Sequence, residues 1–446
     1  MRNGTEPAGL PLLGHLVRFK RDPLGLLNAA RANGDLTRLR FGPRTAFVVN
    51  HPDLIEEVLV IQHRVFAKSC GRKFSRLSRF LAGGEQVDRV THFPADNDFW
   101  MRQRPTIQPA FFHPQVSAYG DVMTRVIEGV IADWRVGEVR DVYVDMVRLA
   151  FRIVATTLFG EEDESEQRTL ADAFETIMFE IAQRLANPLH VPPIVPTRRN
   201  RRLVRAVADV ERIVDRLVER HRSGRGGGGA LLEIMLKDNR TQDPEWRYNV
   251  VGLFVAGYET TAVALTWTWH LLATHPDEEA KLRAELAGVL GDRAPSPGNV
   301  QELTYTEAIL KESLRLYPPL WAFAREAVED FTLGAQKMPA GTIVIISPWV
   351  THRDGRYFDD PNAFRPSRWL GSAASQPPKY AYMPFSAGPR SCIGQRFALL
   401  EMLLAIATVA QRFRLADAAG SLAVPKPWIG LRPRYGMPMV VTAARS

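Results

Sequence analysis

The segment PFSAGPRSCIGQR, residues 384–396, decides what fold and chemistry this chain can carry. It contains Cys392, one of only two cysteines in 446 residues. Gly388 and Gly394 bracket the thiol, Arg390 adds positive charge, and the apolar stretch that follows predicts a helix. Positive surroundings and a helix N-terminus favour the thiolate, which is the form of cysteine that binds metal. We therefore interpret Cys392 as a candidate metal ligand.

The other cysteine, Cys70, is far away in the sequence, so the chain has no disulfide framework and a reducing compartment is expected. No histidine pair has zinc-site spacing, which argues against a Cys₄ or Cys₂His₂ centre. Two readings of Cys392 stay open from the residues alone. It is a buried free thiol, or it is the single protein ligand to the metal of a cofactor.

The composition is that of a globular protein, with 46% hydrophobic and 24% charged residues. A net charge of +8 and a pI of about 9.6 are compatible with an acidic partner. The densest basic run, residues 198–202, is interpreted as the solvated start of a helix. No basic segment is interleaved with aromatic residues, so we expect no nucleic-acid partner.

The hydrophobic pattern predicts a mainly α fold with small β-sheets, in one domain spanning residues 1–446 without a fused reductase. A β-hairpin is expected around Gly42-Pro43, with further short strands in 322–347 and 430–443. Helices are expected at about 23–33, from 52, from about 99, across 116–236 with breaks at 187–196 and 224–229, and at 243–274, 277–290, 305–317 and after 392.

Residues 250–273 are long enough to cross a bilayer, and Glu259 is their only formal charge at pH 7, with His270 neutral. A mid-membrane acid costs about 2.5–3.5 kcal/mol on insertion scales. The sequence has no second stretch of this kind. We therefore predict a buried central helix, no membrane span and a cytoplasmic protein.

This helix contains an unusual group of small and polar residues. Ala256 and Thr260 are four residues apart and share a face, as do Gly257 and Thr261. A glycine inside a helix costs about 1 kcal/mol relative to alanine, so a flat or bulky group against the helix is one explanation. The small residues Ala256 and Gly257 predict a groove in the helix surface, and Glu259 and Thr260 place an acid and an alcohol beside it. The alternative is a helix kink with a back-bonded threonine.

The chain resembles the cytochrome P450 family of haem-thiolate monooxygenases. FSAGPRSCIG matches the family's ligand-loop pattern, Phe-x-x-Gly-x-Arg-x-Cys-x-Gly, at every fixed position. The resemblance implies that Cys392 is the axial ligand of haem b, and that Arg390 pairs with a haem propionate. The loop residues expected at the cofactor are Phe385, Gly388, Arg390 and Gly394.

Further motifs agree in order and spacing. AGYETT at 256–261 is similar to the oxygen-activation segment, which implies that Ala256 lies beside the haem. By the same resemblance Thr260 holds a water by hydrogen bonds during oxygen activation, and Glu259 connects that point to solvent.

ESLR at 312–315 matches the family's Glu-x-x-Arg pair, and Glu312 and Arg315 are spaced for a buried ion pair. FRPSRW at 364–369 implies Arg368 as the third member of this structural triad, although Ser367 stands where a glutamate is common. The resemblance also implies that Trp100, Arg104 and Arg325 lie at the cofactor.

The implied activity is the hydroxylation or epoxidation of a small hydrophobic substrate with O₂, for example a terpenoid, polyketide or aromatic product of secondary metabolism. Electrons would come from a ferredoxin or flavodoxin with its reductase, with Arg396 a candidate contact, and we expect a monomer. A haem-thiolate sensor without turnover is the alternative, as is a coupling, nitration or rearrangement enzyme of the same fold. Substrate-pocket candidates are Leu253, Val255, Ala256, Leu320 and Phe323, with segments 69–99 and 175–195. The stretch 83–100 departs from the short glycine-rich entry to the Trp-x-x-x-Arg helix that is common in the family.

Overall fold

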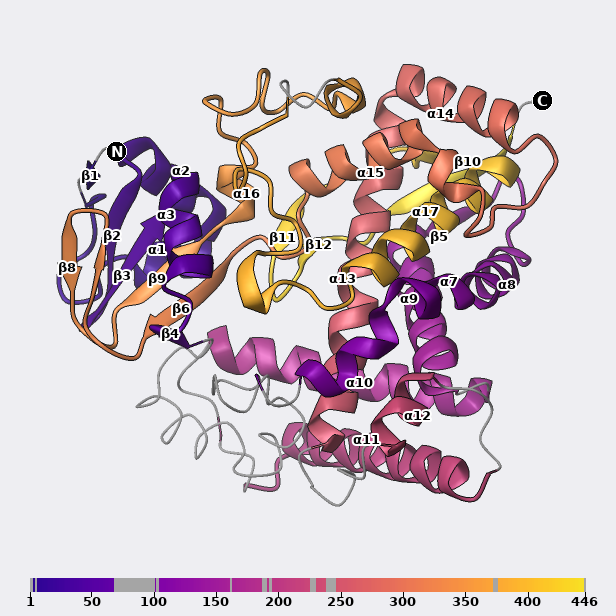
Figure 1. The fold of residues 1–446 in the computed structure, drawn as a ribbon, viewed down its shortest axis with the longest axis horizontal. Helices are drawn as coiled ribbons and strands as arrows, with labels where there is room; N and C mark the ends of the chain where they lie inside the picture. Colours follow the sequence, from indigo (N-terminus) through magenta and orange to yellow (C-terminus); the bar gives the residue numbers. More distant parts are fainter. Residues whose placement is uncertain are drawn as a thin grey trace.

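The computed structural model describes residues 3–4, 6–67, 101, 104–160, 163–186, 191, 195–224, 230–237, 246–371 and 376–444. The predicted fold class is confirmed, because helices predominate and the sheets are small (Figure 1). A sheet-rich part lies at the left of Figure 1 and a helix-rich part at the right, with α13 running through the helices. The longer helices are α2 (Pro23–Asn33), α8 (Gly120–Ile131), α9 (Val142–Phe159), α10 (Glu164–Ala186), α11 (Arg198–Arg222), α13 (Trp246–Thr274), α14 (Pro276–Val289), α15 (Thr304–Leu316) and α17 (Gln395–Arg412).

Shorter α-helices and thirteen strands connect the longer helices in the described part of the chain. Short helices are α1 (Leu16–Arg21), α3 (Pro52–Glu56), α7 (His113–Ala118), α12 (Ala230–Lys237) and α16 (Pro348–Thr351). The strands are β1 (Asn3–Gly4), β2 (Leu36–Phe41), β3 (Arg44–Val49), β4 (Phe66–Ala67), β5 (Val139–Asp141), β6 (Phe323–Ala327), β7 (Phe331–Leu333), β8 (Gln336–Met338), β9 (Ile343–Ile346), β10 (Phe413–Asp417), β11 (Pro425–Pro427), β12 (Leu431–Pro433) and β13 (Pro438–Ala443).

The largest sheet joins distant parts of the chain in the strand order β1-β2-β3-β9-β6-β4. β2 and β3 form the predicted hairpin, and Gly42 at its turn has a φ of +60°. β3 pairs with β9 in parallel, which brings residues 343–346 beside 46–49. A second sheet, β10-β13-β5, and the β11–β12 hairpin lie near the C-terminus.

Local signals account for where helices begin and end. α2 begins as predicted, with Pro23 in its first turn and the Asp22 carboxylate accepting a hydrogen bond from Gly25 N at 2.9 Å. α9 ends at Gly160, whose φ of +65° is left-handed. The helical pattern predicted across residues 116–236 corresponds to several separate helices, from α7 to α12.

The central helix α13 is part of the protein core. The segment Val250–Thr274 is apolar enough to span a membrane by composition, but 67% of its most apolar window is buried inside the protein. Phe254 stacks on Phe159 of α9 at 4.1 Å between ring centroids, and Phe151 and Phe174 extend this cluster. Burying a large side chain contributes about 1.5–3 kcal/mol, so this packing explains why the helix is apolar all round. The predicted start at Asp243 lies outside the described residues.

Candidate active site

Residues 384–394, here called the cysteine loop, form a compact turn before α17. Cys392 N donates to Phe385 O at 2.9 Å, and Ser391 N donates to Gly388 O at 3.0 Å. Gly388 has a φ of +71°, and a Cβ on it would lie 2.0 Å from Leu59 O. Only glycine fits this position, because any side chain would collide with that carbonyl. The loop leaves Cys392 exposed and not in the packed core.

Cys392 lines a cavity of about 430 Å³ at the start of α17. The other lining residues are Arg104, Gln108, Phe111, Phe112, Ile393, Gln395 and Arg396. Arg104 Nη1 donates to Ser391 O at 2.7 Å, which ties this guanidinium to the cysteine loop. Burial lowers the pKa of Arg104 below its ordinary value, and the charge of Cys392 partly offsets this effect. The thiol therefore has both open space and an adjacent cation.

Two residues of α13 are exposed where nearly all of their neighbours are buried. They are Ala256 and Thr260, four residues apart, whereas Phe254, Tyr258 and Ala262 are buried. Leu253, three residues before Ala256, is half-buried and lies on the same face. α13 packs directly against α17, which begins three residues after Cys392. The open face of α13 and the cysteine loop thus belong to two helices in contact.

The Thr260 hydroxyl donates to Ala256 O at 2.8 Å. This is the back-bonded arrangement that the sequence left open as an alternative. Thr261, Thr266 and Thr268 of the same helix make the same type of bond. Back-bonding therefore does not distinguish Thr260, but its exposure does, since these three neighbours are buried.

Gly257 does not contribute to this open face. A Cβ on Gly257 would lie 2.9 Å from Val154 Cγ2 of α9. The glycine therefore allows α9 and α13 to approach closely. The expectation that Gly257 helps to form the groove is therefore wrong. The open surface is made by Ala256 and Thr260, whereas Gly257 faces α9.

Glu259 is buried in an ion pair with the C-terminal hairpin. Arg432 Nε of β12 donates to Glu259 Oε1 at 2.6 Å, and the glutamate side chain is only 3% exposed. The Arg432 guanidinium lies over the Trp428 ring at 4.2 Å. Burial disfavours the charged guanidinium, but the hydrogen bond and charge of Glu259 outweigh it and raise the pKa of Arg432. No sequence pattern indicates this partner for Glu259, because Arg432 is 173 positions away.

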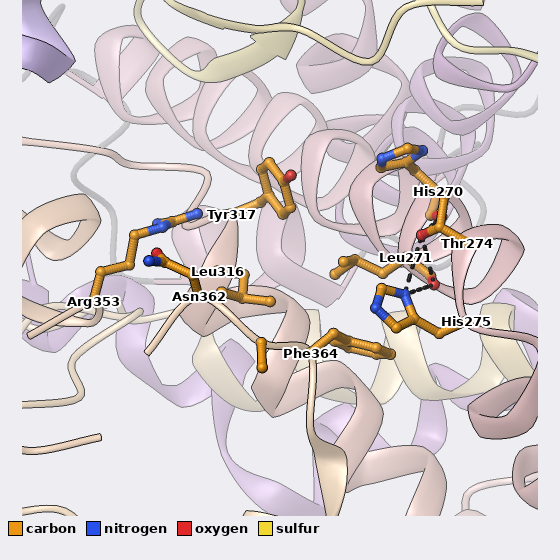
Figure 2. Close-up of a pocket in the computed structure, with 10 residues that line it drawn as sticks. His270, Leu271, Thr274, His275, Leu316, Tyr317, Arg353, Asn362 and Phe364 are labelled. Atoms are coloured by element: carbon orange, nitrogen blue, oxygen red, sulfur yellow. Dashed lines mark hydrogen bonds between the residues drawn. The ribbon is translucent and has the colours of Figure 1, made fainter. Parts of the chain in front are cut away.

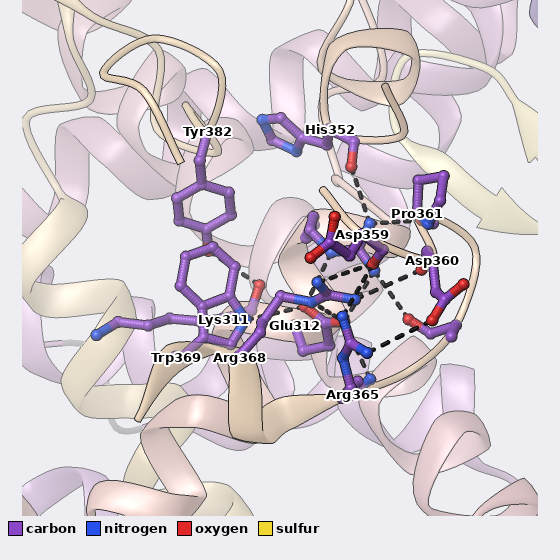
Figure 3. A network of polar contacts seen from close by, with 12 residues as sticks. Lys311, Glu312, His352, Asp359, Asp360, Pro361, Arg365, Arg368, Trp369 and Tyr382 are labelled. Atoms are coloured by element: carbon purple, nitrogen blue, oxygen red, sulfur yellow. Dashed lines mark hydrogen bonds and ion pairs between the residues drawn. The ribbon is translucent and has the colours of Figure 1, made fainter. Parts of the chain in front are cut away.

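Glu312 and Arg368 lie together in one network of polar contacts (Figure 3). Arg315 also pairs with Glu312; these two residues are buried, and Arg368 is half-buried. Arg315 donates to both Glu312 oxygens at 2.8 Å, and Arg368 Nε donates to Oε1 at 2.8 Å. Trp369 Nε1 donates to Oε2 at 2.9 Å, a contact that sequence reasoning missed. Burial alone would raise the pKa of Glu312, but the hydrogen bonds and charges of the arginines lower it below its ordinary value.

This network reaches the segment that leads into the cysteine loop. Arg315 Nη1 donates to His352 O at 2.9 Å, and Met383 N donates to His352 Nε2 at 2.9 Å. Met383 O in turn accepts from Ser386 N at 3.0 Å. The ion pair therefore helps to fix the backbone that presents Cys392.

The remaining predicted residues are spread around these elements. Phe385, Arg390 and Gly394 are half-buried in or beside the cysteine loop. Arg325 lies on β6, buried, with its guanidinium 5.0 Å from the Phe323 ring. Of the pocket candidates, Phe323 is half-buried, Leu320 is exposed, and Val255 is buried on the Glu259 face of α13. Trp100, Cys70 and segment 69–99 lie outside the described residues, as does much of 187–194.

A second cavity of about 490 Å³ lies at the C-terminal end of α13 (Figure 2). Its lining includes His270, His275, Tyr317 and Arg353. His270 pairs with Asp417 at 3.1 Å. This cavity begins ten residues beyond Thr260, about 15 Å along the helix at 1.5 Å per residue, and it contains no cysteine. We therefore place the active site at Cys392 and the open face of α13.

Comparison with known proteins decides the family. The family model described as "Cytochrome P450" matches residues 5–433. The chain belongs to the cytochrome P450 family. This cytochrome P450 is 36% identical over 438 residues to "Cyclooctatin synthase" of Streptomyces melanosporofaciens, covering 96% of this chain and 94% of that protein. It is also 36% identical over 426 residues to "Cyclooctat-9-en-7-ol 5-monooxygenase" of the same organism, covering 94% and 90%. "Pentalenene oxygenase" of Streptomyces avermitilis is 34% identical over 419 residues, covering 92% and 91%.

Family membership makes this cytochrome P450 a haem-dependent monooxygenase that acts on a small hydrophobic substrate and requires O₂ and a redox partner. The geometry fits a haem, because Cys392 offers an exposed thiol and Arg104 and Arg390 lie in or beside its loop. Within the described ranges no group of three or more His, Cys, Asp or Glu side chains could hold a metal ion. A cofactor that brings its other metal ligands with it suits such a site.

Proposed function

We propose that this cytochrome P450 hydroxylates or epoxidises a terpenoid. Three relatives that align over nearly the whole chain are named for cyclooctatin, cyclooctat-9-en-7-ol and pentalenene, and they are terpenoid-modifying enzymes. The observation that carries the site assignment is the exposure of Cys392 together with that of Ala256 and Thr260 on a helix most of whose described side chains are buried. A product of secondary metabolism is the expected substrate class.

Cys392 would hold haem b through its thiolate. Arg104, Arg325 and Arg390, with Trp100, would pair with the propionates, and Phe385, Gly388, Gly394 and Ala256 would contact the cofactor. A thiolate-ligated haem, when bound, activates O₂ and oxidises the substrate. The rest of the chemistry belongs to the protein, which must orient the substrate, exclude water and deliver protons.

Thr260 would hold a proton at its hydroxyl oxygen on the open face of α13. Its present bond to Ala256 O fixes the hydroxyl at that face, where it can also accept a hydrogen bond from water. Glu259 would supply protons from the buried side of the helix. Its carboxylate is bound to Arg432, so this role requires the side chain to leave the ion pair.

Electrons would come from a ferredoxin or flavodoxin with its reductase. Arg396 is exposed beside Cys392, and the chain carries a net charge of +8, both of which favour an acidic partner. We propose the cytoplasm as the location and a monomer as the working form. Reduction rates that do not change with salt concentration would argue against the charge-guided contact.

The experiment that tests the substrate class is a spin-state titration of purified holoprotein. Cyclic terpenoid hydrocarbons and alcohols, including pentalenene and cyclooctat-9-en-7-ol, are compared with macrolide polyketides and with aromatic products of similar size. We expect saturable spectral shifts with terpenoids, and products heavier by one oxygen atom when a surrogate ferredoxin system is added. Saturation by polyketides or aromatics alone would refute the terpenoid assignment, whereas the absence of any oxygenated product would refute the activity.

A further inference from the structure

Four leucines are exposed within seven residues near the N-terminus. Leu10, Leu12, Leu13 and Leu16 are 49%, 91%, 46% and 45% exposed. Single exposed leucines are common, whereas large exposed apolar patches mark protein or membrane interaction sites. Four exposed leucines within one short turn are therefore a candidate for such a site. We call residues 10–16 the leucine turn.

The leucine turn has a defined backbone. Leu10 N donates to Gly14 O at 2.9 Å, Gly14 N donates to Leu10 O at 2.9 Å, and Leu13 N donates to Pro11 O at 2.7 Å. Gly14 has a φ of +57°, and a Cβ there would lie 2.3 Å from Arg40 O of β2. The turn is therefore held against the edge of the β2–β3 hairpin, and its leucines are presented by a fixed scaffold.

Leu12 adopts a backbone conformation that a leucine avoids. Its φ is +62°, in the left-handed region, where a Cβ crowds the following carbonyl and glycine is favoured. The side chain has no compensating packing, because it is 91% exposed. A strained residue that buries nothing suggests a contact made elsewhere.

Basic side chains accompany the leucines. Lys20 is four residues after Leu16 in α1, so the two share a face, and both are exposed. Arg18 and Arg21 of the same helix are also exposed. Of the nearby acids, Glu6 is already paired with Arg40 at 2.6 Å, and the exposed Asp22 accepts a hydrogen bond from Gly25 N at the start of α2, which leaves three basic side chains to one acid in this segment. The patch is therefore apolar at its tip and positively charged behind it.

We propose that the leucine turn inserts into the surface of an anionic lipid bilayer, with the basic residues of α1 at the headgroups. Apolar insertion combined with basic residues is how proteins bind such surfaces without spanning them. The proposal does not depend on the substrate class or on the roles of Thr260 and Glu259. It would place the enzyme at the surface of a membrane, where an apolar substrate accumulates.

The test is co-sedimentation of the full-length holoprotein with vesicles of phosphatidylcholine alone or with added phosphatidylglycerol. We expect binding to the anionic vesicles that weakens at high salt. Leu12→Gly removes the side chain and accepts the left-handed backbone, so we expect binding to fall on the order of tenfold while the melting temperature stays level or rises. Leu422→Ser is the matched control, because Leu422 is 66% exposed and lies outside the leucine turn.

Three outcomes would overturn the proposal. They are no binding of the wild type to anionic vesicles, equal binding by wild type and Leu12→Gly, and an equal loss in Leu422→Ser. Sedimentation velocity without vesicles tests the alternative that a second copy of this chain covers the leucine turn. A wild-type dimer that Leu12→Gly converts to a monomer, with no vesicle binding, would assign the leucine turn to self-association instead.

Discussion

Arg432 of the C-terminal hairpin forms a 2.6 Å ion pair with Glu259, the acid next to the exposed Thr260 of α13. Glu259 is buried and Arg432 is half-buried, and the hairpin backbone is fixed independently. Trp267 Nε1 of α13 donates to Leu431 O at 2.7 Å, and Leu431 N donates to Pro319 O at 2.9 Å. The C-terminal hairpin is thus part of the surroundings of the proposed proton donor.

Arg432→Gln should destabilise the protein by about 3–5 kcal/mol, because it leaves the Glu259 carboxylate buried without its cation. The double variant Glu259→Gln/Arg432→Gln should be less destabilised than the sum of the single variants. Chemical denaturation measures these values. The control is Arg412→Gln, since the Arg412–Glu128 pair is exposed and should contribute about 0–1 kcal/mol. Equal losses in the two arginine variants would contradict the account.

Thr260→Ala should leave haem binding intact and divert electrons from product to peroxide, because an exposed hydroxyl that holds a proton is lost. Positioned proton transfer contributes about 10²–10⁴-fold, so product per NADPH should fall at least about tenfold. Product and peroxide are measured per NADPH consumed. Thr266→Ala is the matched control, because Thr266 makes the same bond to its own helix but is fully buried. Undiminished coupling in Thr260→Ala would rule out the role.

Gly257→Ala should destabilise the contact between α9 and α13 by about 1–3 kcal/mol, because its Cβ would lie 2.9 Å from Val154 Cγ2. Val154→Ala removes the clashing methyl groups. In the Val154→Ala background, Gly257→Ala should therefore be neutral or stabilising, since alanine is the better helix former. Thermal unfolding of the four proteins gives the coupling. Simple additivity would show that Gly257 serves something other than this contact.

The sequence predicted parts of this arrangement and missed others for identifiable reasons. Periodicity located α13, and the three-residue spacing of Glu312 and Arg315 predicted their ion pair, since both are local signals. Gly257 has no local signal that tells a helix contact from an open face. Arg432 is 173 positions from Glu259, and no pattern links them in the sequence. The motif at 364–369 implies a role for the cation Arg368, and no pattern in it marks the Trp369 indole as a further donor to Glu312.

The stability of the protein should fall in acid through His352. Burial, reinforced by the charges of Arg315 and Arg353, lowers the pKa of His352 to about 3 from an ordinary 6.5. Between about pH 3 and pH 6.5, His352 is protonated in the unfolded chain but neutral in the folded protein. The free energy of unfolding should therefore decrease as the pH falls below about 6.5, by at most about 1.4 kcal/mol per unit.

His352→Gln keeps an acceptor for Met383 N and removes this titration, so its stability should depend less steeply on pH between about 4 and 6. Denaturation curves at several pH values measure the slope. His113→Gln, at an exposed histidine, provides the control and should retain the wild-type slope. Identical slopes in wild type and His352→Gln would show that another group governs the acid transition.

The most direct measurement of the central claim is the absorption spectrum of the reduced carbon monoxide complex of wild type and Cys392→Ser. The wild-type holoprotein should give the long-wavelength band of a thiolate-ligated haem, and Cys392→Ser should lose it. Cys70→Ser, at the only other cysteine, should retain it. Persistence of the band in Cys392→Ser, or its loss in Cys70→Ser alone, would contradict the assignment of Cys392 as the ligand.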